Sequence, residues 1–108
     1  MGKSSMSEWV DVVAESALAI GENIVVDVDG IDVAVFNLDG EFYAIQDVCS
    51  HDGGEIVSGI VEGNEIQCPR HGARFCIKTG KVKAPPAYED IACYEIRSNN
   101  GRIEVREN

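Results

Sequence analysis

The sequence reads CSHDGG at residues 49–54 and CPRHGARF at residues 68–75. Each stretch holds a Cys that is followed two or three residues later by a His, and the sequence contains no further His. Thiolate sulfur and imidazole nitrogen are common protein ligands of zinc and iron. The pattern therefore predicts one metal site shared by two loops, and the candidate ligands are Cys49, His51, Cys68 and His71.

The residues around these ligands are typical of loops that close over a bound group. Gly53, Gly54 and Gly72 allow the backbone to approach the group and to direct N–H donors toward it. Pro69 fixes one backbone dihedral between the two ligands of the second loop. Both stretches follow short predicted strands, so the ligands are expected in loops.

Two kinds of metal site fit these ligands. Two thiolates and two imidazoles can close a tetrahedral zinc site, but such sites usually pair their ligands as Cys-x₂-Cys and His-x₃₋₅-His. Here each loop supplies one Cys and one His. That arrangement suits a cluster of two irons, in which each loop gives a Cys to one iron and a His to the other. The residues favour the two-iron cluster and leave the zinc site open.

Outside the loops, the hydrophobic pattern has a period of two and predicts an all-β fold, with short antiparallel strands in a small sandwich or partly open barrel. The pairs Asp29-Gly30, Asp39-Gly40 and Gly63-Asn64 predict hairpin turns. Residues 15–19 have a helix-forming composition, but they suffice for one turn at most. The expected strands are residues 9–14, 23–29, 31–38, 41–46, 60–62, 65–67, 73–77, 91–97 and 102–106.

The chain has 108 residues, 44% of them hydrophobic and 26% charged, which is ordinary for one globular domain. We expect a disordered leader at residues 1–7 and a single domain at residues 8–108, with the metal-binding part at about 47–86. No stretch is typical of a membrane span or a secretory signal, so we expect a cytoplasmic protein with reduced thiols. We interpret the two remaining cysteines, Cys76 and Cys93, as small buried hydrophobic residues.

Acidic residues outnumber basic ones by 19 to 9, which gives a formal net charge of −10. We therefore expect no binding to nucleic acid or to an anionic membrane. The charge is uneven, because residues 1–69 hold 14 acidic residues and one basic residue, whereas residues 70–83 hold five basic residues and no acidic one. This distribution fits either a solvated surface or a docking surface for a charged partner.

The ligand pattern Cys-x-His, sixteen residues, then Cys-x-x-His resembles the Rieske [2Fe–2S] family. The resemblance covers nearly the whole domain and includes a later proline loop at Pro85-Pro86. It implies the Rieske fold, with a cluster-binding subdomain built on two loops, and one [2Fe–2S] cluster. By this resemblance, Cys49 and Cys68 bind the inner iron, and His51 and His71 bind the outer, more exposed iron.

Departures from the family pattern indicate the subtype. Rieske proteins of respiration and photosynthesis carry an extra Cys in each loop and join the two loops by a disulfide, but here those positions hold Gly54 and Arg70. The same relatives use Ser and Tyr hydroxyls to donate hydrogen bonds to sulfur, where this chain has Ala73 and Phe75. Fewer donors to sulfur lower the reduction potential, so the chain resembles a low-potential Rieske ferredoxin.

The resemblance implies a monomeric one-electron carrier and no enzyme activity of its own. Its partners would be a flavin-dependent ferredoxin reductase and the terminal oxygenase of a ring-hydroxylating dioxygenase system. Such an oxygenase carries a large catalytic domain after its own Rieske domain, and this sequence stops at Asn108. One alternative is an electron-transfer small subunit of a larger reductase such as nitrite reductase. The other is a Cys₂His₂ zinc module for protein interaction.

Charged residues near the loops have two possible roles. Asp47, Asp52 and Glu55 flank the first ligand pair and are either docking residues or ordinary polar loop residues. Arg74 directly follows the second loop, and we expect it to pair with a nearby acid rather than to approach the cluster.

Overall fold

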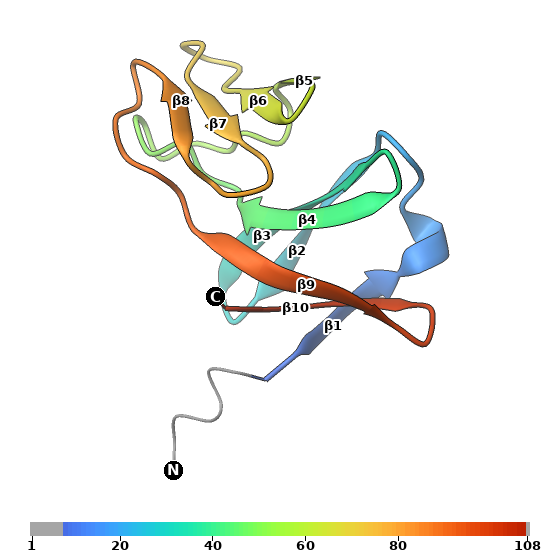
Figure 1. Cartoon of the computed structure of the whole chain (residues 1–108). Helices are drawn as coiled ribbons and strands as arrows, with labels where there is room; N and C mark the ends of the chain where they lie inside the picture. Colours follow the sequence, from blue (N-terminus) through green and yellow to red (C-terminus); the bar gives the residue numbers. More distant parts are fainter. Residues whose placement is uncertain (1–7, 108) are drawn as a thin grey trace.

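The computed structural model describes residues 8–107. The elements are β1 (Val10–Ala14), η2 (Glu15–Ala17), β2 (Asn23–Val28), β3 (Ile31–Leu38), β4 (Glu41–Gln46), β5 (Ile60–Glu62), β6 (Glu65–Gln67), β7 (Arg74–Cys76), β8 (Val82–Ala84), β9 (Cys93–Asn99) and β10 (Arg102–Glu107). In this range the strands form two antiparallel sheets, with the orders β1-β10-β9-β4-β3-β2 and β5-β6-β7-β8. The larger sheet curls into a nearly closed barrel, and the smaller sheet lies beside it (Figure 1). Within residues 8–107, no helix is long and apolar enough to cross a membrane.

The three predicted hairpins are confirmed, and their turns explain the strand registers. Asp29 and Gly30 both have positive φ values, 53° and 85°, and Asp39 and Gly40 repeat this geometry with 55° and 96°. Two consecutive residues with positive φ make the turn type whose twist matches that of antiparallel strands. Residues 63–64 close the third hairpin, between β5 and β6.

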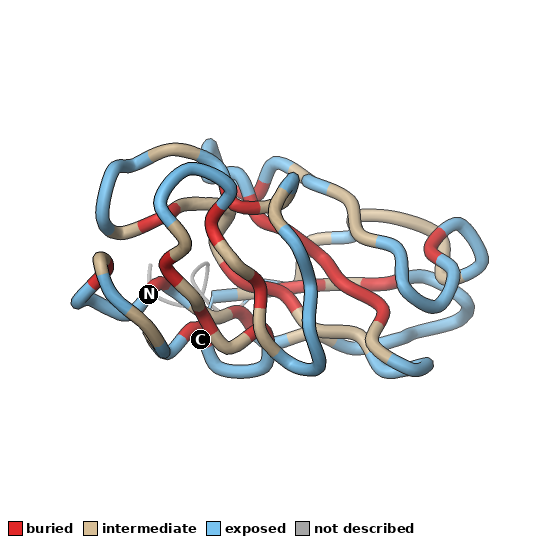
Figure 2. The backbone as a smooth tube through the Cα atoms, turned by 90° about the horizontal axis from the view of Figure 1, so that it is seen from above, coloured by how far each residue is buried: buried red, intermediate tan, exposed pale blue. Residues whose placement is uncertain are grey.

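Strand β3 is buried on both faces and connects the two layers of the core. Val33 and Val35 face the inside of the barrel, whereas Ala34 and Phe36 pack against residues of the smaller sheet. Figure 2 shows buried segments through the middle of the molecule, with exposed turns at its edges. The apolar run in β3 therefore reflects two buried faces, which is why its hydrophobicity does not alternate.

The smaller sheet is inserted between β4 and β9, which are neighbours in the larger sheet. Ile45 of β4 pairs with Cys93 of β9, and all residues of the smaller sheet lie between them in the sequence. The chain leaves β4 through residues 47–59 and returns after β8 through residues 85–92. Both predicted ligand loops therefore belong to this inserted part.

Two details differ from the sequence-based expectation. Strand β8 is not among the expected strands, because it has only three residues, and its middle residue Lys83 and the preceding Lys81 are exposed. Strand β9 begins at Cys93 rather than at Ile91, because the Ile91 N–H donates to the Gly80 carbonyl (2.9 Å) as the chain crosses between sheets. The leader expected at residues 1–7 lies outside the described residues.

Candidate metal centre

The two ligand loops close on themselves in the same way. In the first loop the Cys49 N–H donates to the Gly54 carbonyl (2.7 Å), and the Cys49 carbonyl accepts from the Gly53 N–H (2.7 Å). In the second loop the Cys68 N–H donates to the carbonyl five residues later (2.6 Å), and its carbonyl accepts from the N–H four residues later (3.2 Å). Each loop is therefore a six-residue turn that begins at its Cys and carries its His near the middle.

The structure brings all four predicted ligands together and separates them by depth. Cys49 and Cys68 are fully buried in the core between the sheets. Burial raises the pKa of the Cys49 thiol, and the adjacent Cys68 thiol adds to this rise through a hydrogen bond. His51 and His71 are exposed, and their ring centroids lie 5.0 Å apart with perpendicular planes. Sulfur donors thus lie inside and imidazoles at the surface.

This donor set fits a [2Fe–2S] group better than a single zinc ion. The thiols approach each other in the interior, and the imidazoles form a second pair nearer the solvent. Such a division into a sulfur pair and a nitrogen pair suits two metal ions, each bound by one pair. The Asp52 carboxylate also approaches Cys49 and His51, with one possible ligand atom of each residue within 4.8 Å of the others.

Acidic side chains hold the first loop in shape. The Asp47 carboxylate accepts from the N–H groups of Ile56 (2.8 Å) and Val57 (3.0 Å). The Glu55 carboxylate accepts from the N–H of Ser58 (3.0 Å) and from its hydroxyl (2.8 Å). These contacts favour the interpretation of both acids as polar loop residues, and Glu55 Oε2 also lies 3.7 Å from Arg70 Nη1 of the second loop.

A third loop supports the first one from outside. The Ser50 hydroxyl donates to the Glu89 carbonyl (2.6 Å), 39 residues further along the chain. This loop follows Pro85-Pro86, joined by a cis peptide bond, and it carries Tyr88 with 80% of its surface exposed. The proline loop noted in the sequence therefore does lie beside the candidate ligands, and Ser50 is a supporting residue that the sequence analysis missed.

Gly59 lies against the backbone that leads into the second loop. A Cβ at this position would lie 1.8 Å from the carbonyl oxygen of Gln67, the residue before Cys68. Replacing Gly59 with Ala must push the two loops apart, and we expect the free energy of unfolding to fall by about 2–3 kcal/mol. Urea unfolding followed by circular dichroism measures this change. The control is Ile60→Ala, because the Ile60 side chain is exposed; an equal loss in both variants would contradict the steric explanation.

Arg74 pairs with acids, as predicted. Its guanidinium contacts the carboxylates of Glu62 (2.5 Å) and Glu65 (3.5 Å), and it donates to the side-chain carbonyl of Gln67 (3.2 Å). These partners belong to β5 and β6. Arg74 therefore joins neighbouring strands of the smaller sheet.

The prediction that Cys76 and Cys93 are buried is wrong, because both are only half-buried, although Cys93 packs against the hydrophobic core. Burial alone would raise the pKa of the Cys76 thiol. Hydrogen bonds from the Thr79 hydroxyl and from the N–H groups of Lys78 and Thr79 outweigh this effect and lower that pKa. The Cys93 thiol donates to the Lys78 carbonyl (3.9 Å). Both cysteines are therefore polar partners of the turn after β7.

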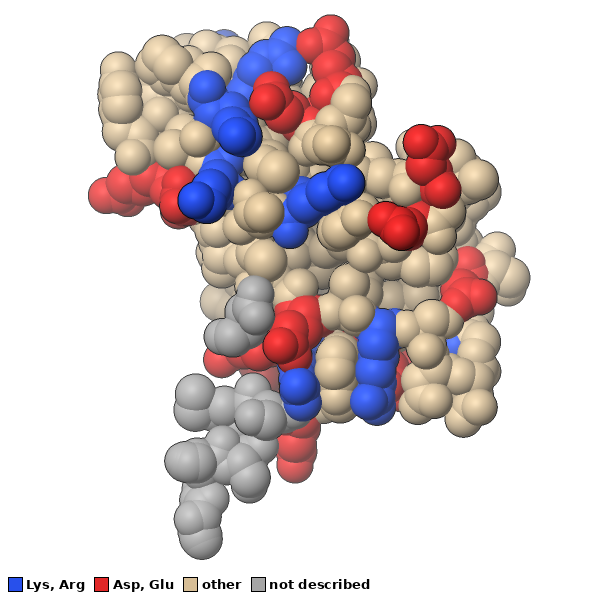
Figure 3. Space-filling view, viewed as in Figure 1, with Lys and Arg blue, Asp and Glu red and all other residues tan. Residues whose placement is uncertain are grey.

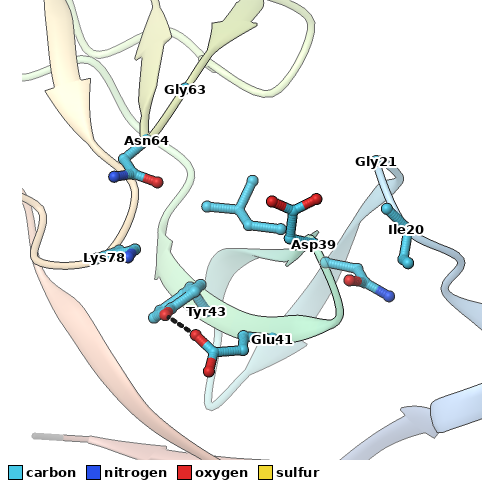
Figure 4. A pocket seen from close by; sticks show the side chains of 10 residues that line it. Ile20, Gly21, Asp39, Glu41, Tyr43, Gly63, Asn64 and Lys78 are labelled. Atoms are coloured by element: carbon cyan, nitrogen blue, oxygen red, sulfur yellow. Dashed lines mark hydrogen bonds between the residues drawn. The ribbon is translucent and has the colours of Figure 1, made fainter.

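A separate pocket of about 450 Å³ lies between the two sheets (Figure 4). Tyr43 lies in its wall and donates to the Glu41 carboxylate (2.7 Å), which raises the pKa of the Tyr43 hydroxyl. The Lys78 amine lies 5.4 Å from the centroid of the Tyr43 ring, and Asn64 contributes from the β5–β6 turn. No predicted ligand lines this pocket, so it is distinct from the metal centre.

The comparison with known families agrees with this geometry. Residues 8–95 match the Rieske [2Fe–2S] domain family. The chain belongs to the Rieske family. Its cofactor is accordingly a Rieske-type [2Fe–2S] cluster, which decides against the zinc module.

Similar Rieske proteins come from dioxygenase systems. The ferredoxin component of the naphthalene 1,2-dioxygenase system of Pseudomonas putida is 34% identical over 98 residues, which are 91% of this chain and 94% of the relative. The biphenyl dioxygenase ferredoxin subunit of Pseudomonas sp. strain KKS102 is 44% identical over 78 residues, 71% of this chain and 72% of the relative. Both relatives are electron-transfer components of their systems.

Solved structures give the same result. The ferredoxin of carbazole 1,9a-dioxygenase from Nocardioides aromaticivorans IC177 has a TM-score of 0.87 at 30% identity, over 93% of this chain and 98% of that one. A second structure, the complex of reduced oxygenase and oxidized ferredoxin in carbazole 1,9a-dioxygenase, matches with a TM-score of 0.84 at 29% identity, over 91% and 92%. The predicted Rieske fold is confirmed.

Proposed function

We propose that Cys49 and Cys68 hold the inner iron of the cluster and that His51 and His71 hold the outer iron. The support is the division by depth, with two buried thiols in contact and two exposed imidazoles 5.0 Å apart. When bound, the cluster supplies a site that accepts and releases one electron. The protein keeps water from the thiolates and presents the imidazole side to the surface, where a partner protein can approach.

The protein is an electron carrier of the Rieske ferredoxin type and not itself a catalyst, as its relatives are ferredoxin components. We propose that it receives electrons from a flavin-dependent ferredoxin reductase and delivers them to the terminal oxygenase of a ring-hydroxylating dioxygenase. The complex of a related ferredoxin with its oxygenase supports this partner. The likeness to these ferredoxins favours a free carrier over a small subunit of nitrite reductase.

The function is tested with the purified protein. We expect two iron and two sulfide per chain, an EPR signal only after reduction, and oxidation of the reduced protein by a ring-hydroxylating oxygenase. A colourless protein with one zinc per chain would contradict the proposal. If no such oxygenase reoxidised the reduced cluster, the cofactor assignment would stand, but the proposed oxygenase partner would be contradicted.

We further propose that residues 8–108 form one domain and that the protein is a cytoplasmic monomer. Phe36 and Ile45 of the larger sheet share one core cluster with Ile66 and Phe75 of the smaller sheet, which supports one domain. No disulfide joins the four cysteines, which all lie in the described residues, and this suits a reducing compartment. Gel filtration of the protein with its cluster measures the oligomeric state.

Positive charge without acidic partners lies in the turn between β7 and β8 and in β8 itself. Every Arg in residues 8–107 contacts an acid, whereas Lys78, Lys81 and Lys83 have no acidic partner there. Figure 3 shows Lys and Arg side chains over the part of the molecule that carries β7 and β8. On a protein with a net charge of −10, this local charge can orient an approaching partner.

We expect electron transfer to the oxygenase to depend strongly on salt. Because exposed charges are screened beyond about 10 Å at 0.1 M salt, raising sodium chloride from about 0.05 to 0.5 M should slow the second-order rate about tenfold. Stopped-flow reoxidation of the reduced protein measures this rate. Replacing the three lysines with Gln should flatten the salt dependence, and an unchanged slope would show that these lysines do not face the partner.

A further inference from the structure

Arg70 makes two ion pairs with the first loop, a long one with Glu55 (Nη1 to Oε2, 3.7 Å) and a close one with Asp52. Arg70 of the second loop contacts Asp52 of the first through two parallel bonds, Nε to Oδ2 at 2.6 Å and Nη2 to Oδ1 at 3.0 Å. The same carboxylate accepts from the Gly54 N–H (2.9 Å), which fixes its orientation within the first loop. Paired bonds of this kind are the strongest that an arginine makes with a carboxylate.

Gly54 makes room for this pair. A Cβ on Gly54 would lie 2.6 Å from both Cζ and Nη2 of Arg70, so the guanidinium rests against the Gly54 backbone. Gly54 is not among the residues with positive φ, and Arg70 provides the three nearest atoms that a Cβ would meet. A Cβ at this position would therefore displace the flexible end of the Arg70 side chain without straining the backbone.

The pair also lies close to the proposed ligands. Asp52 Oδ2 is 3.7 Å from His71 Nδ1, so the carboxylate of one loop reaches the imidazole of the other. The side chains of Arg70 and Asp52 are only 34% and 21% exposed. The ion pair between the loops therefore lies against the proposed ligand His71 and is partly shielded from water.

We propose that Arg70, Asp52 and Gly54 form a non-covalent clasp that keeps the two loops closed over the cluster, in place of a covalent bridge between them. Gly54 and Arg70 are the two positions at which other Rieske proteins are expected to carry the disulfide cysteines, and in this chain they are in contact. These are positioning residues, and the inference rests on the ligand assignment proposed above. Because the clasp is electrostatic and partly exposed, salt weakens it, whereas a disulfide is insensitive to salt.

The direct test measures how fast the assembled protein loses its cluster to an excess of a ferrous chelator, followed by visible absorbance. We expect Arg70→Met to accelerate the loss about fivefold at low salt and less at high salt. Gly54→Ala should have a similar effect, because the added methyl group displaces the guanidinium. The double variant Gly54→Ala/Arg70→Met should lose its cluster no faster than either single variant, because all three variants break the same contact.

A matched control is Arg102→Met. Arg102 and Asp11 form a paired contact of the same geometry, with bonds of 2.9 and 3.0 Å, between β1 and β10. Its loss should leave the rate of cluster release unchanged. Arg70→Lys, which keeps the charge without the paired bonds, should lie between Arg70→Met and the unmodified protein.

The reduction potential separates a clasp from a simple charge effect. Arg70→Met leaves the Asp52 carboxylate unbalanced and should lower the potential, whereas Asp52→Asn leaves the guanidinium and should raise it. The double variant Asp52→Asn/Arg70→Met should return to nearly the original potential and still lose its cluster quickly. If the double variant regained both the original potential and the original rate of cluster loss, the clasp would be overturned. An Arg70→Met protein that loses its cluster as slowly as the original protein would also overturn it. An original protein without iron and sulfide would overturn the ligand assignment itself.

Discussion

Replacing Cys68 with Ala should give a protein that binds no [2Fe–2S] cluster. Cys68 is fully buried next to Cys49, and Ala cannot replace a thiolate ligand. With one sulfur of the inner pair missing, the inner iron loses half of its protein ligands. Iron and inorganic sulfide per chain should both fall to background, and the visible absorbance of the purified protein should disappear.

The chain provides its own controls for this prediction. Cys76→Ala and Cys93→Ala remove thiols of the same chemistry that lie outside both ligand loops. Both variants should keep two iron and two sulfide per chain. Circular dichroism of the Cys68→Ala protein checks that its strands still form. A Cys68→Ala protein with a full cluster, or a Cys76→Ala protein without one, would show that the ligands are assigned wrongly.

Short-range signals explain how much of the fold could be predicted. The hairpin turns at Asp29-Gly30 and Asp39-Gly40 are set by two adjacent residues that accept positive φ, so a dipeptide is enough to place them. The ligand pattern is equally local, because each loop closes within six residues of its Cys. In both cases the residues that determine the local structure are close neighbours in the sequence.

Contacts between distant residues explain what could not be predicted. Nothing near Gly59 in the sequence shows that the Gln67 carbonyl lies against it, and nothing near Cys93 shows that its thiol lies at the Lys78 carbonyl. Strand β8 exists because β7 offers it a partner, not because its three residues favour a strand. These features arise only when separate segments pack together.

The loop clasp lies between these two cases. Asp52 and Arg70 carry opposite charges in two loops that the ligand pattern already brings together, so a contact between them was open to prediction. Its geometry was not, because only the structure shows the guanidinium resting on Gly54. Where a sequence lacks the two cysteines of a disulfide, a non-covalent contact can therefore join the same two positions.

Replacing His71 with Cys should keep a two-iron cluster and lower its reduction potential strongly. His71 is exposed, so a smaller side chain there leaves no buried cavity. A thiolate adds negative charge where a neutral imidazole was, and this charge opposes the arrival of an electron. Rieske clusters have potentials of about −150 to +300 mV and all-Cys plant-type clusters about −400 mV, so we expect a fall of about 200 mV or more. Titration of the visible spectrum in a spectroelectrochemical cell measures the potential.

The variants His51→Cys and Tyr88→Cys test whether the fall in reduction potential arises from replacing a ligand. His51 is the other half of the exposed imidazole pair, with its ring centroid 5.0 Å from that of His71, and its replacement should also lower the potential. Tyr88 is highly exposed in the loop that accepts a hydrogen bond from Ser50, so a thiol there lies near the centre without a ligand role. Tyr88→Cys should leave the potential unchanged. If all three variants behave alike, the potential responds to an added surface thiol, and the imidazole pair does not hold the outer iron.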